Sequence, residues 1–193
     1  MKTTILLILG GVFFAQVATA DIVGDRENGR KVARQCKTCH GSDGLAKLPI
    51  APHIGGEPAE YLIRQLTAFR DGERHHEMMS VVASGLDDQS IADVAAWYAG
   101  HIASASLKPG VNAADAPEAC VGCHGSTGIA EIEDAPNLAG ETAMYIDTQL
   151  KAFRLGKRHH EIMSDVAADL DDAEIRAFAQ WYAQSNLSVE AVE

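Results

Sequence analysis

One sequence unit occurs twice in this chain of 193 residues, and the two copies align without a gap when the sequence is shifted by 84 positions. Of the 64 positions from Cys36 to Ala99, 35 carry the same residue in both copies. This period is far longer than that of a stacked solenoid repeat. The chain is therefore predicted to fold as two small domains of one type in tandem.

The first 20 residues have the features of a secretory signal. Lys2 gives a positive start, an apolar run covers positions 5–17, and Ala18-Thr19-Ala20 forms a small-residue cleavage site. The run is shorter than the roughly 20 residues that span a bilayer. We therefore predict an exported, periplasmic protein whose mature part has no transmembrane segment, with peripheral membrane association left open. The predicted divisions are a signal peptide at 1–20, a first domain at 21–102, a linker at 103–114 and a second domain at 115–193.

Each domain is predicted to be all-α, because apolar side chains recur at helical spacing. We expect a first helix over 27–36, a middle helix from Tyr61 to Phe69 and a last helix that begins at Asp87. Gly72 and its counterpart Gly156 stand where the middle helices need C-caps. No convincing strand pattern is present. The expected buried stripe of the last helix is Ile91, Val94, Ala95 and Tyr98.

The charge balance narrows the range of partners. The chain has 16 basic and 27 acidic residues, which gives a net charge of −11 at pH 7. Such a surface argues against nucleic acid and against anionic lipid as binding partners. It suits a basic protein surface, although simple solubility explains the same charge.

All four cysteines lie in two C-x-x-C-H motifs. The first comprises Cys36, Cys39 and His40, and the second comprises Cys120, Cys123 and His124. Two thiols about one helical turn apart match the spacing of the two vinyl groups of haem, and the histidine that follows directly is aimed at the iron. An exported chain with this pattern in both domains is therefore predicted to carry two covalently attached haem c groups.

Two other interpretations of the cysteines were weighed. Four cysteines in an exported chain could form two disulfides, and a zinc site could use both thiolate pairs if they converged. The gapless repeat places each pair in its own domain, which disfavours a shared zinc site. Neither alternative needs the histidine that follows each pair.

With these motifs, the chain resembles di-haem class I cytochromes c of the cytochrome c4 type. The resemblance rests on CKTCHG and CVGCHG, on QLTAFRDGER and QLKAFRLGKR, and on the terminal helices that begin at LDD, and it covers nearly all of the mature sequence. It implies two cytochrome c-like helical domains, each wrapped around one haem, in a periplasmic electron carrier. It also implies that the carbonyls of Pro52 and Pro136 accept hydrogen bonds from the axial histidines.

The repeat selects the sixth iron ligands. Met79 and Met163 occupy matching positions, each 39 residues after the histidine of its motif, whereas Met78 matches an isoleucine and Met144 a glutamate. A Met/His pair gives a six-coordinate iron with a raised potential. We therefore predict His40 and Met79, and His124 and Met163, as the metal ligands of the two haems.

Histidines are the competing sixth ligands. His75-His76 and His159-His160 precede the methionines in both copies, and a bis-histidine haem would have a lower potential. The simpler interpretation is that they are exposed loop residues. His53 and His101 have no histidine counterpart in the other copy and receive no role.

Three functional classes are consistent with this pattern. The first is a free di-haem carrier that takes electrons from a membrane complex or dehydrogenase and passes them to a terminal oxidase or reductase. The second, suggested by a further resemblance, is the di-haem subunit of a flavocytochrome c sulfide dehydrogenase, bound to a flavoprotein. The third, a di-haem peroxidase, requires an iron without a tight sixth ligand, and such enzymes are longer. No other catalytic residue pattern is found.

Overall fold

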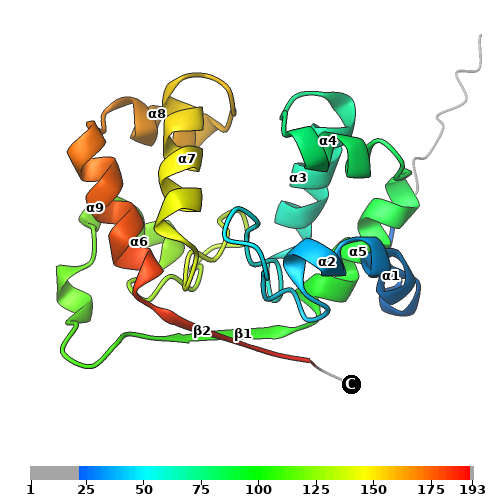
Figure 1. Ribbon diagram of the computed structural model, residues 1–193, viewed down its shortest axis with the longest axis horizontal. Helices are drawn as coiled ribbons and strands as arrows, with labels where there is room; N and C mark the ends of the chain where they lie inside the picture. Colours follow the sequence, from blue (N-terminus) through cyan, green and yellow to red (C-terminus); the bar gives the residue numbers. More distant parts are fainter. Residues whose placement is uncertain (1–21, 192–193) are drawn as a thin grey trace, which may run out of the picture.

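Two helical domains of similar build lie side by side in the computed structural model, which describes residues 22–191. The predicted signal peptide at 1–20 lies outside these residues. Figure 1 shows α3 (Ala59–Asp71) of the first domain and α7 (Ala143–Arg154) of the second facing each other in the middle of the molecule. The prediction of two tandem all-α domains is confirmed, with the addition of one short β-ribbon.

The helices of the two domains follow one plan. In the first domain they are α1 (Arg26–Val32), the 3₁₀-helix η1 (Ala33–Gln35), α2 (Lys37–His40), α3, α4 (Glu77–Ala83) and α5 (Asp88–Ala99). In the second domain they are the 3₁₀-helix η2 (Ala113–Asp115), α6 (Glu118–His124), α7, α8 (Glu161–Ala168) and α9 (Asp172–Ala183). None of the helices in the described part of the chain is both long enough and apolar enough to cross a membrane.

The last helix of each domain supplies the largest fully buried side chains of the core. In α5 the expected stripe is buried, and Ile91, Val94, Ala95 and Tyr98 are each no more than 2% exposed. In the second domain Ile175, Ala179 and Tyr182 of α9 are equally buried and pack with Ile146 and Leu150 of α7. Removing this apolar surface from water is the main contribution to the stability of each small domain.

The predicted helix ends are present. Asp87 and Asp171 are the N-caps of α5 and α9, and Asp171 forms a capping box with Glu174. Gly72 ends α3 with φ of 81°, a left-handed conformation that favours glycine. In the second domain Leu155 takes the C-cap position of α7, and Gly156 adopts the left-handed conformation one residue later.

One prediction about secondary structure was wrong, because the described residues include two strands. β1 (Ile102–Ser106) pairs antiparallel with β2 (Asn186–Glu190), and the register joins Ile102 to Glu190 and Ser106 to Asn186. Each strand has only five residues, and the partners are 80 to 88 positions apart in the chain. Pairing at such a distance, and not a local sequence preference, makes these segments strands.

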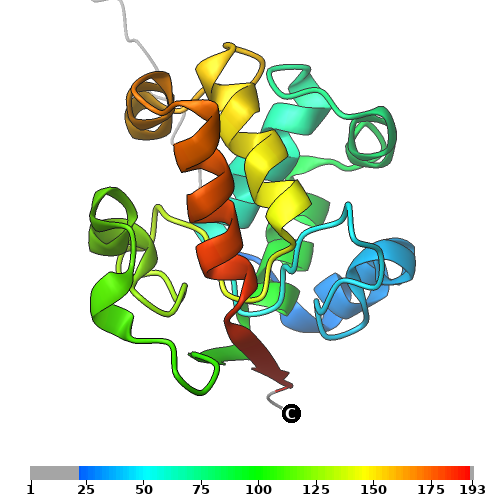
Figure 2. The ribbon, with the colours of Figure 1, turned by 60° about the vertical axis from the view of Figure 1, so that its left-hand side comes forward.

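The ribbon runs beneath both domains (Figures 1 and 2). It lies so close to the glycine-containing loops above it that a Cβ atom added to Gly56 would meet Ala103 of β1. A Cβ atom added to Gly55 would meet Val189 of β2. The C-terminal strand of the second domain therefore contacts a loop of the first, which helps to hold the two domains in one arrangement.

Replacing Gly29 with alanine should destabilise the first domain. Gly29 is buried in α1 where this helix packs on α5, and an added Cβ atom would overlap the backbone oxygen of Asp93. Overpacking against rigid backbone costs roughly 1–3 kcal/mol, which denaturant unfolding followed by far-ultraviolet circular dichroism can measure. Gly85→Ala is the control, since its added Cβ would meet only the oxygen of Val82 at 3.7 Å. Equal stability of the two variants would contradict the close crossing of α1 and α5.

Candidate cofactor sites

The two C-x-x-C-H motifs form matching helical turns. Cys36 is the N-cap of α2, and its carbonyl accepts the backbone N–H groups of Cys39 at 3.2 Å and His40 at 3.0 Å. In the second domain, Cys120, Cys123 and His124 all lie within α6. The two thiols of each motif are therefore about one turn apart, as attachment to two vinyl groups requires.

The histidine of each motif is buried and oriented by one hydrogen bond. His40 and His124 are 7% and 6% exposed. The Nδ1 atom of His40 lies 2.9 Å from the carbonyl oxygen of Pro52, and the Nδ1 atom of His124 lies 2.9 Å from that of Pro136. A carbonyl can only accept, so Nδ1 carries the proton and Nε2 is left as the nitrogen that can bind a metal. The two prolines thus have the role that the resemblance implied.

Electrostatics keeps both rings neutral. Burial lowers the pKa of His40 and of His124, while the hydrogen bond to the proline carbonyl acts in the opposite sense. The pKa of His40 is lowered further by His76, and that of His124 by His160. Neutral imidazole is the form that coordinates iron.

The cysteines are available for covalent attachment. All four are unpaired, so the disulfide alternative is not formed. Among the described residues, no three His, Cys, Asp or Glu side chains converge as a metal cluster, so the donor set of a structural zinc site is not assembled. Burial raises the pKa of the Cys36 and Cys120 thiols to about 11.

The four candidate methionines differ in exposure as the repeat predicts. Met79 in α4 and Met163 in α8 are partly buried. Met78 is 60% exposed and Met144 is 52% exposed. Met163 and Cys120 pack against the same apolar cluster of the second domain. The two methionines with matched spacing are therefore less exposed than the other two.

These residues fit a covalently bound haem in each domain. Each domain offers two free thiols on one helical turn, a buried histidine with Nε2 available, and a partly buried methionine on a separate helix. A thiol pair, an imidazole and a thioether form the donor set that haem c and its iron require. The apolar core beside each motif provides the low-dielectric surroundings that the porphyrin needs.

Two matched loops join the domains beside these sites. The backbone N–H of His53 donates to Glu141 Oε1 at 2.7 Å, and the backbone N–H of Asn137 donates to Glu57 Oε2 at 2.9 Å. These loops follow Pro52 and Pro136 directly, so the segments that orient the histidines also form the interface. Both glutamates are 3% exposed, which makes this contact a buried and nearly two-fold symmetric one.

His53 has a structural role that its lack of a histidine counterpart concealed. Its repeat partner is Asn137, and the two side chains make equivalent bonds. His53 Nδ1 accepts from Ala46 N at 2.9 Å, as Asn137 Oδ1 accepts from Ala130 N at 2.9 Å. Asn137 Nδ2 donates to the Gly56 carbonyl at 3.0 Å, and His53 Nε2 lies 3.2 Å from the Gly140 carbonyl.

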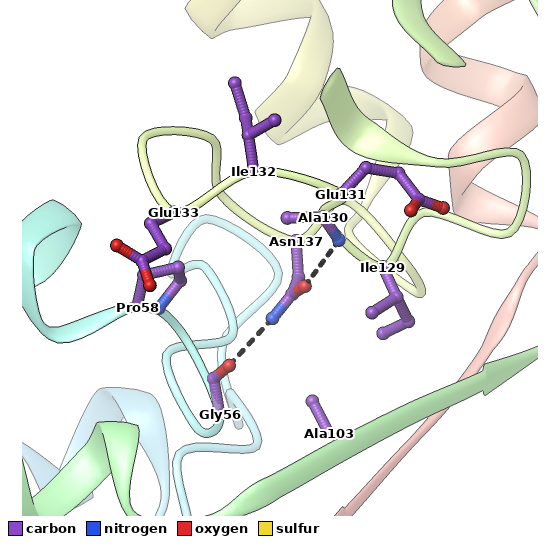
Figure 3. A pocket seen from close by; sticks show the side chains of 9 residues that line it. All are labelled: Gly56, Pro58, Ala103, Ile129, Ala130, Glu131, Ile132, Glu133 and Asn137. Carbon is purple, nitrogen blue, oxygen red and sulfur yellow. Dashed lines mark hydrogen bonds between the residues drawn. The ribbon is translucent and has the colours of Figure 1, made fainter. Parts of the chain in front are cut away.

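Figure 3 shows the asparagine bonds beside a cavity that residues of both domains line. Because either side chain accepts on one side and donates on the other, identity alone could not reveal the match.

A second symmetric cluster lies between the middle helices. Arg74 donates to Gln65 at 2.7 Å and to Gln149 at 2.8 Å, and Arg158 donates to Gln149 at 2.9 Å and to Gln65 at 2.8 Å. The guanidinium of Arg74 also lies over the ring of Phe69 at 4.4 Å. Burial and the neighbouring Arg158 lower the pKa of Arg74. Each glutamine oxygen thus receives one bond from each domain.

Comparison with known proteins agrees with this geometry. The family described as Cytochrome c matches residues 26–99, and the repeat extends the same plan to the second half. Fold and sites therefore define a c-type cytochrome with two haem domains. Cytochrome c4 of Pseudomonas aeruginosa is 31% identical over 94% of this chain and 96% of its own length. The chain belongs to the cytochrome c4 family, and it carries two covalently bound haem c groups with their iron.

Two further similarities bear on function. The crystal structure of reduced recombinant cytochrome c4 from Pseudomonas stutzeri has a TM-score of 0.71 and 28% identity, and the match covers 85% of this chain and all of that one. The thiosulfate dehydrogenase electron acceptor of Thiomonas intermedia is 34% identical over 81% of each chain. The protein is a di-haem electron-transfer cytochrome.

The buried glutamates should make stability depend on pH. Burial raises the pKa of Glu141 to about 8 and that of Glu57 well above its ordinary value of 4.5. The folded protein thus keeps protons that the unfolded chain loses above pH 4.5, so the free energy of unfolding falls as pH rises from 4.5 to about 8. The rise in the pKa of Glu141 from 4.5 to about 8 corresponds to roughly 5 kcal/mol.

Denaturant unfolding at pH 5 and pH 8 tests this dependence. Glu141→Gln keeps the oxygen that accepts from His53 and cannot ionise, so this variant should lose less stability between the two pH values than the unmodified protein. Glu133→Gln, at an exposed position of the second domain, should retain the full loss. An unchanged pH dependence in Glu141→Gln would contradict a buried, protonated glutamate at the interface.

Proposed function

We propose that the protein is a periplasmic electron carrier in which His40 and Met79 are the axial ligands of the first haem iron, and His124 and Met163 those of the second. The observation that carries this proposal is the matched burial of the two methionines, because their neighbours Met78 and Ile162 are exposed. The haem supplies one-electron chemistry between ferrous and ferric iron. The chain holds, shields and tunes it.

In each domain, a histidine and a methionine would be the two protein ligands of the haem iron. Coordination of this kind raises the reduction potential and leaves no open position for peroxide or another substrate. The proline carbonyl that bonds each histidine ring fixes its orientation and makes it a stronger ligand. These properties support a carrier and argue against the di-haem peroxidase alternative.

Contacts between the domains support electron exchange within the molecule. Three kinds of contact join the two domains. They are the hydrogen bonds between the 53–57 and 137–141 loops, the Arg74–Gln149 contact and the β-ribbon. Two cofactor sites in one firmly joined body can exchange an electron without diffusion of either domain. The net charge of −11 suits donors and acceptors with basic docking surfaces.

We propose export to the periplasm from the signal-like residues 1–20, and delivery of electrons from a membrane complex or dehydrogenase to a terminal oxidase or reductase. A second candidate is the electron-accepting subunit of an oxidoreductase. The similarity to the thiosulfate dehydrogenase electron acceptor favours this second role, and a flavocytochrome c sulfide dehydrogenase would use such a subunit in the same way. Co-purification of a dehydrogenase or flavin-containing chain with the native protein would favour the subunit over the free carrier.

Replacing either methionine should alter one haem only. Met79→Ala should lower the potential of the first haem and open it to carbon monoxide, and Met163→Ala should do the same at the second haem, because the iron loses its thioether ligand. A redox titration with carbon monoxide difference spectra measures both effects. Met78→Ala and Met144→Ala are controls at exposed positions and should leave both haems unchanged. Unmodified spectra in Met79→Ala and Met163→Ala would show that these residues do not bind iron.

A further inference from the structure

Each proposed methionine ligand lies in the first turn of a short helix that begins at a histidine. His76 is the N-cap of α4, and its Nδ1 accepts the backbone N–H groups of Met78 at 3.3 Å and Met79 at 3.4 Å. His160 is the N-cap of α8, and its Nδ1 accepts the backbone N–H of Met163 at 3.3 Å. The second histidine of each H-H pair thus bonds the main chain of the ligand itself.

A serine completes each cap from the other direction. The backbone N–H of His76 donates to Ser80 Oγ at 3.2 Å, and that of His160 donates to Ser164 Oγ at 3.1 Å. The two helices have only seven and eight residues, and helices this short have little stability of their own. Fraying begins in the terminal turns, where backbone N–H groups have no helical partner. In these two helices, that turn is the one that holds the methionine.

The cap of the second domain is also tied to the first domain. His160 Nε2 lies 3.1 Å from Asp134 Oδ2, and Asp134 Oδ1 lies 2.6 Å from Arg64 Nη1. Arg64 belongs to α3 of the first domain, and its Nη2 also donates to the Asp134 carbonyl at 3.0 Å. The carboxylate can only accept, so it holds the proton of His160 on Nε2 and leaves Nδ1 as the acceptor that the cap needs.

In the part of the chain that the structure describes, the helix cap at His76 has no matching connection across the interface. The repeat places Ile50 opposite Asp134 and Thr148 opposite Arg64. An isoleucine side chain cannot accept a hydrogen bond, so it cannot orient the ring of His76 in the same way. The difference is therefore built into the sequence at two positions of a nearly symmetric interface.

We infer that His76 and His160 are positioning residues for the sixth iron ligands, and that Asp134 and Arg64 extend the cap across the interface at the second haem alone. This inference rests on the proposed Met/His coordination. Its consequence is that methionine binding at the second haem depends on contact with the first domain. A change in the Asp134–Arg64 contact would therefore act on the second haem through His160, with no matching path through the described residues from the interface to His76.

Competition by imidazole measures how firmly each methionine is held. Added imidazole displaces a loosely held methionine from ferric iron, and the paramagnetically shifted methyl signals in the proton spectrum of the oxidised protein report each site. These signals are assigned with Met79→Ala and Met163→Ala. Loss of an N-cap costs about 1 kcal/mol, so His160→Ala should bind imidazole about fivefold more tightly at the second haem. His76→Ala should show the same change at the first haem.

Other variants separate the cap from the cross-domain connection. His160→Asn keeps a good capping side chain and should restore imidazole affinity to within about twofold of the unmodified protein. Asp134→Ile and Arg64→Thr introduce the residues found at the matching positions of the repeat. Each should tighten imidazole binding about twofold at the second haem only, because a partly exposed ion pair contributes little free energy. His159→Ala is the control, since this exposed neighbour makes no cap.

The outcomes discriminate clearly. Equal imidazole affinities in His160→Ala and His159→Ala would overturn the positioning role, and an equal effect of Asp134→Ile on both haems, or no effect on either, would overturn the cross-domain connection. If the unmodified reduced protein shows no methionine methyl signal from either site, the Met/His coordination itself is wrong, and this inference fails with it.

Discussion

Each domain depends on the hydrogen bond from the buried histidine ring of its C-x-x-C-H motif to a proline carbonyl. This bond joins the helical turn that bears the cysteines to the loop that follows, in the first domain through His40 and Pro52. The same loop continues within a few residues to His53 and Glu57, which contact the other domain. A short stretch of backbone therefore orients a proposed iron ligand on one side and forms the interface on the other. Any movement of one domain against the other acts on a segment that holds the ring.

The duplication explains why the interface is so nearly symmetric. When two copies of one domain meet around a two-fold axis, each contact between them occurs twice. Glu57 and Glu141 each accept a hydrogen bond from the loop of the other domain. Arg74 and Arg158 each donate to the glutamine of the other domain. Departures from symmetry then identify where the two halves have specialised. Asp134 is such a departure. It contacts His160, the N-cap of α8, whereas the matching position of the first domain is Ile50.

Local chemistry made part of this structure predictable from the sequence. The C-x-x-C-H spacing, the capping aspartates and the buried stripe of the last helix depend on neighbours within one or two turns, and the structure has all of them. The β-ribbon and the contacts of His53 with the second domain depend on residues 80 or more positions away, and a local pattern does not reveal such partners. The capping function of His76 and His160 lay between these cases. The pairs follow Arg74 and Arg158 in a polar loop, which favours exposed residues, and histidine is not among the side chains that usually cap helices.

We propose that two six-coordinate Met/His haems lie in one rigid body that transfers electrons. A redox titration of the purified protein, recorded across the visible and far-red spectrum, tests this claim most directly. It should show two one-electron steps, and the fully oxidised protein should show a methionine–iron charge-transfer band with the intensity of two sites. A band with the intensity of one site or none, or a high-spin signal from either haem, would contradict it.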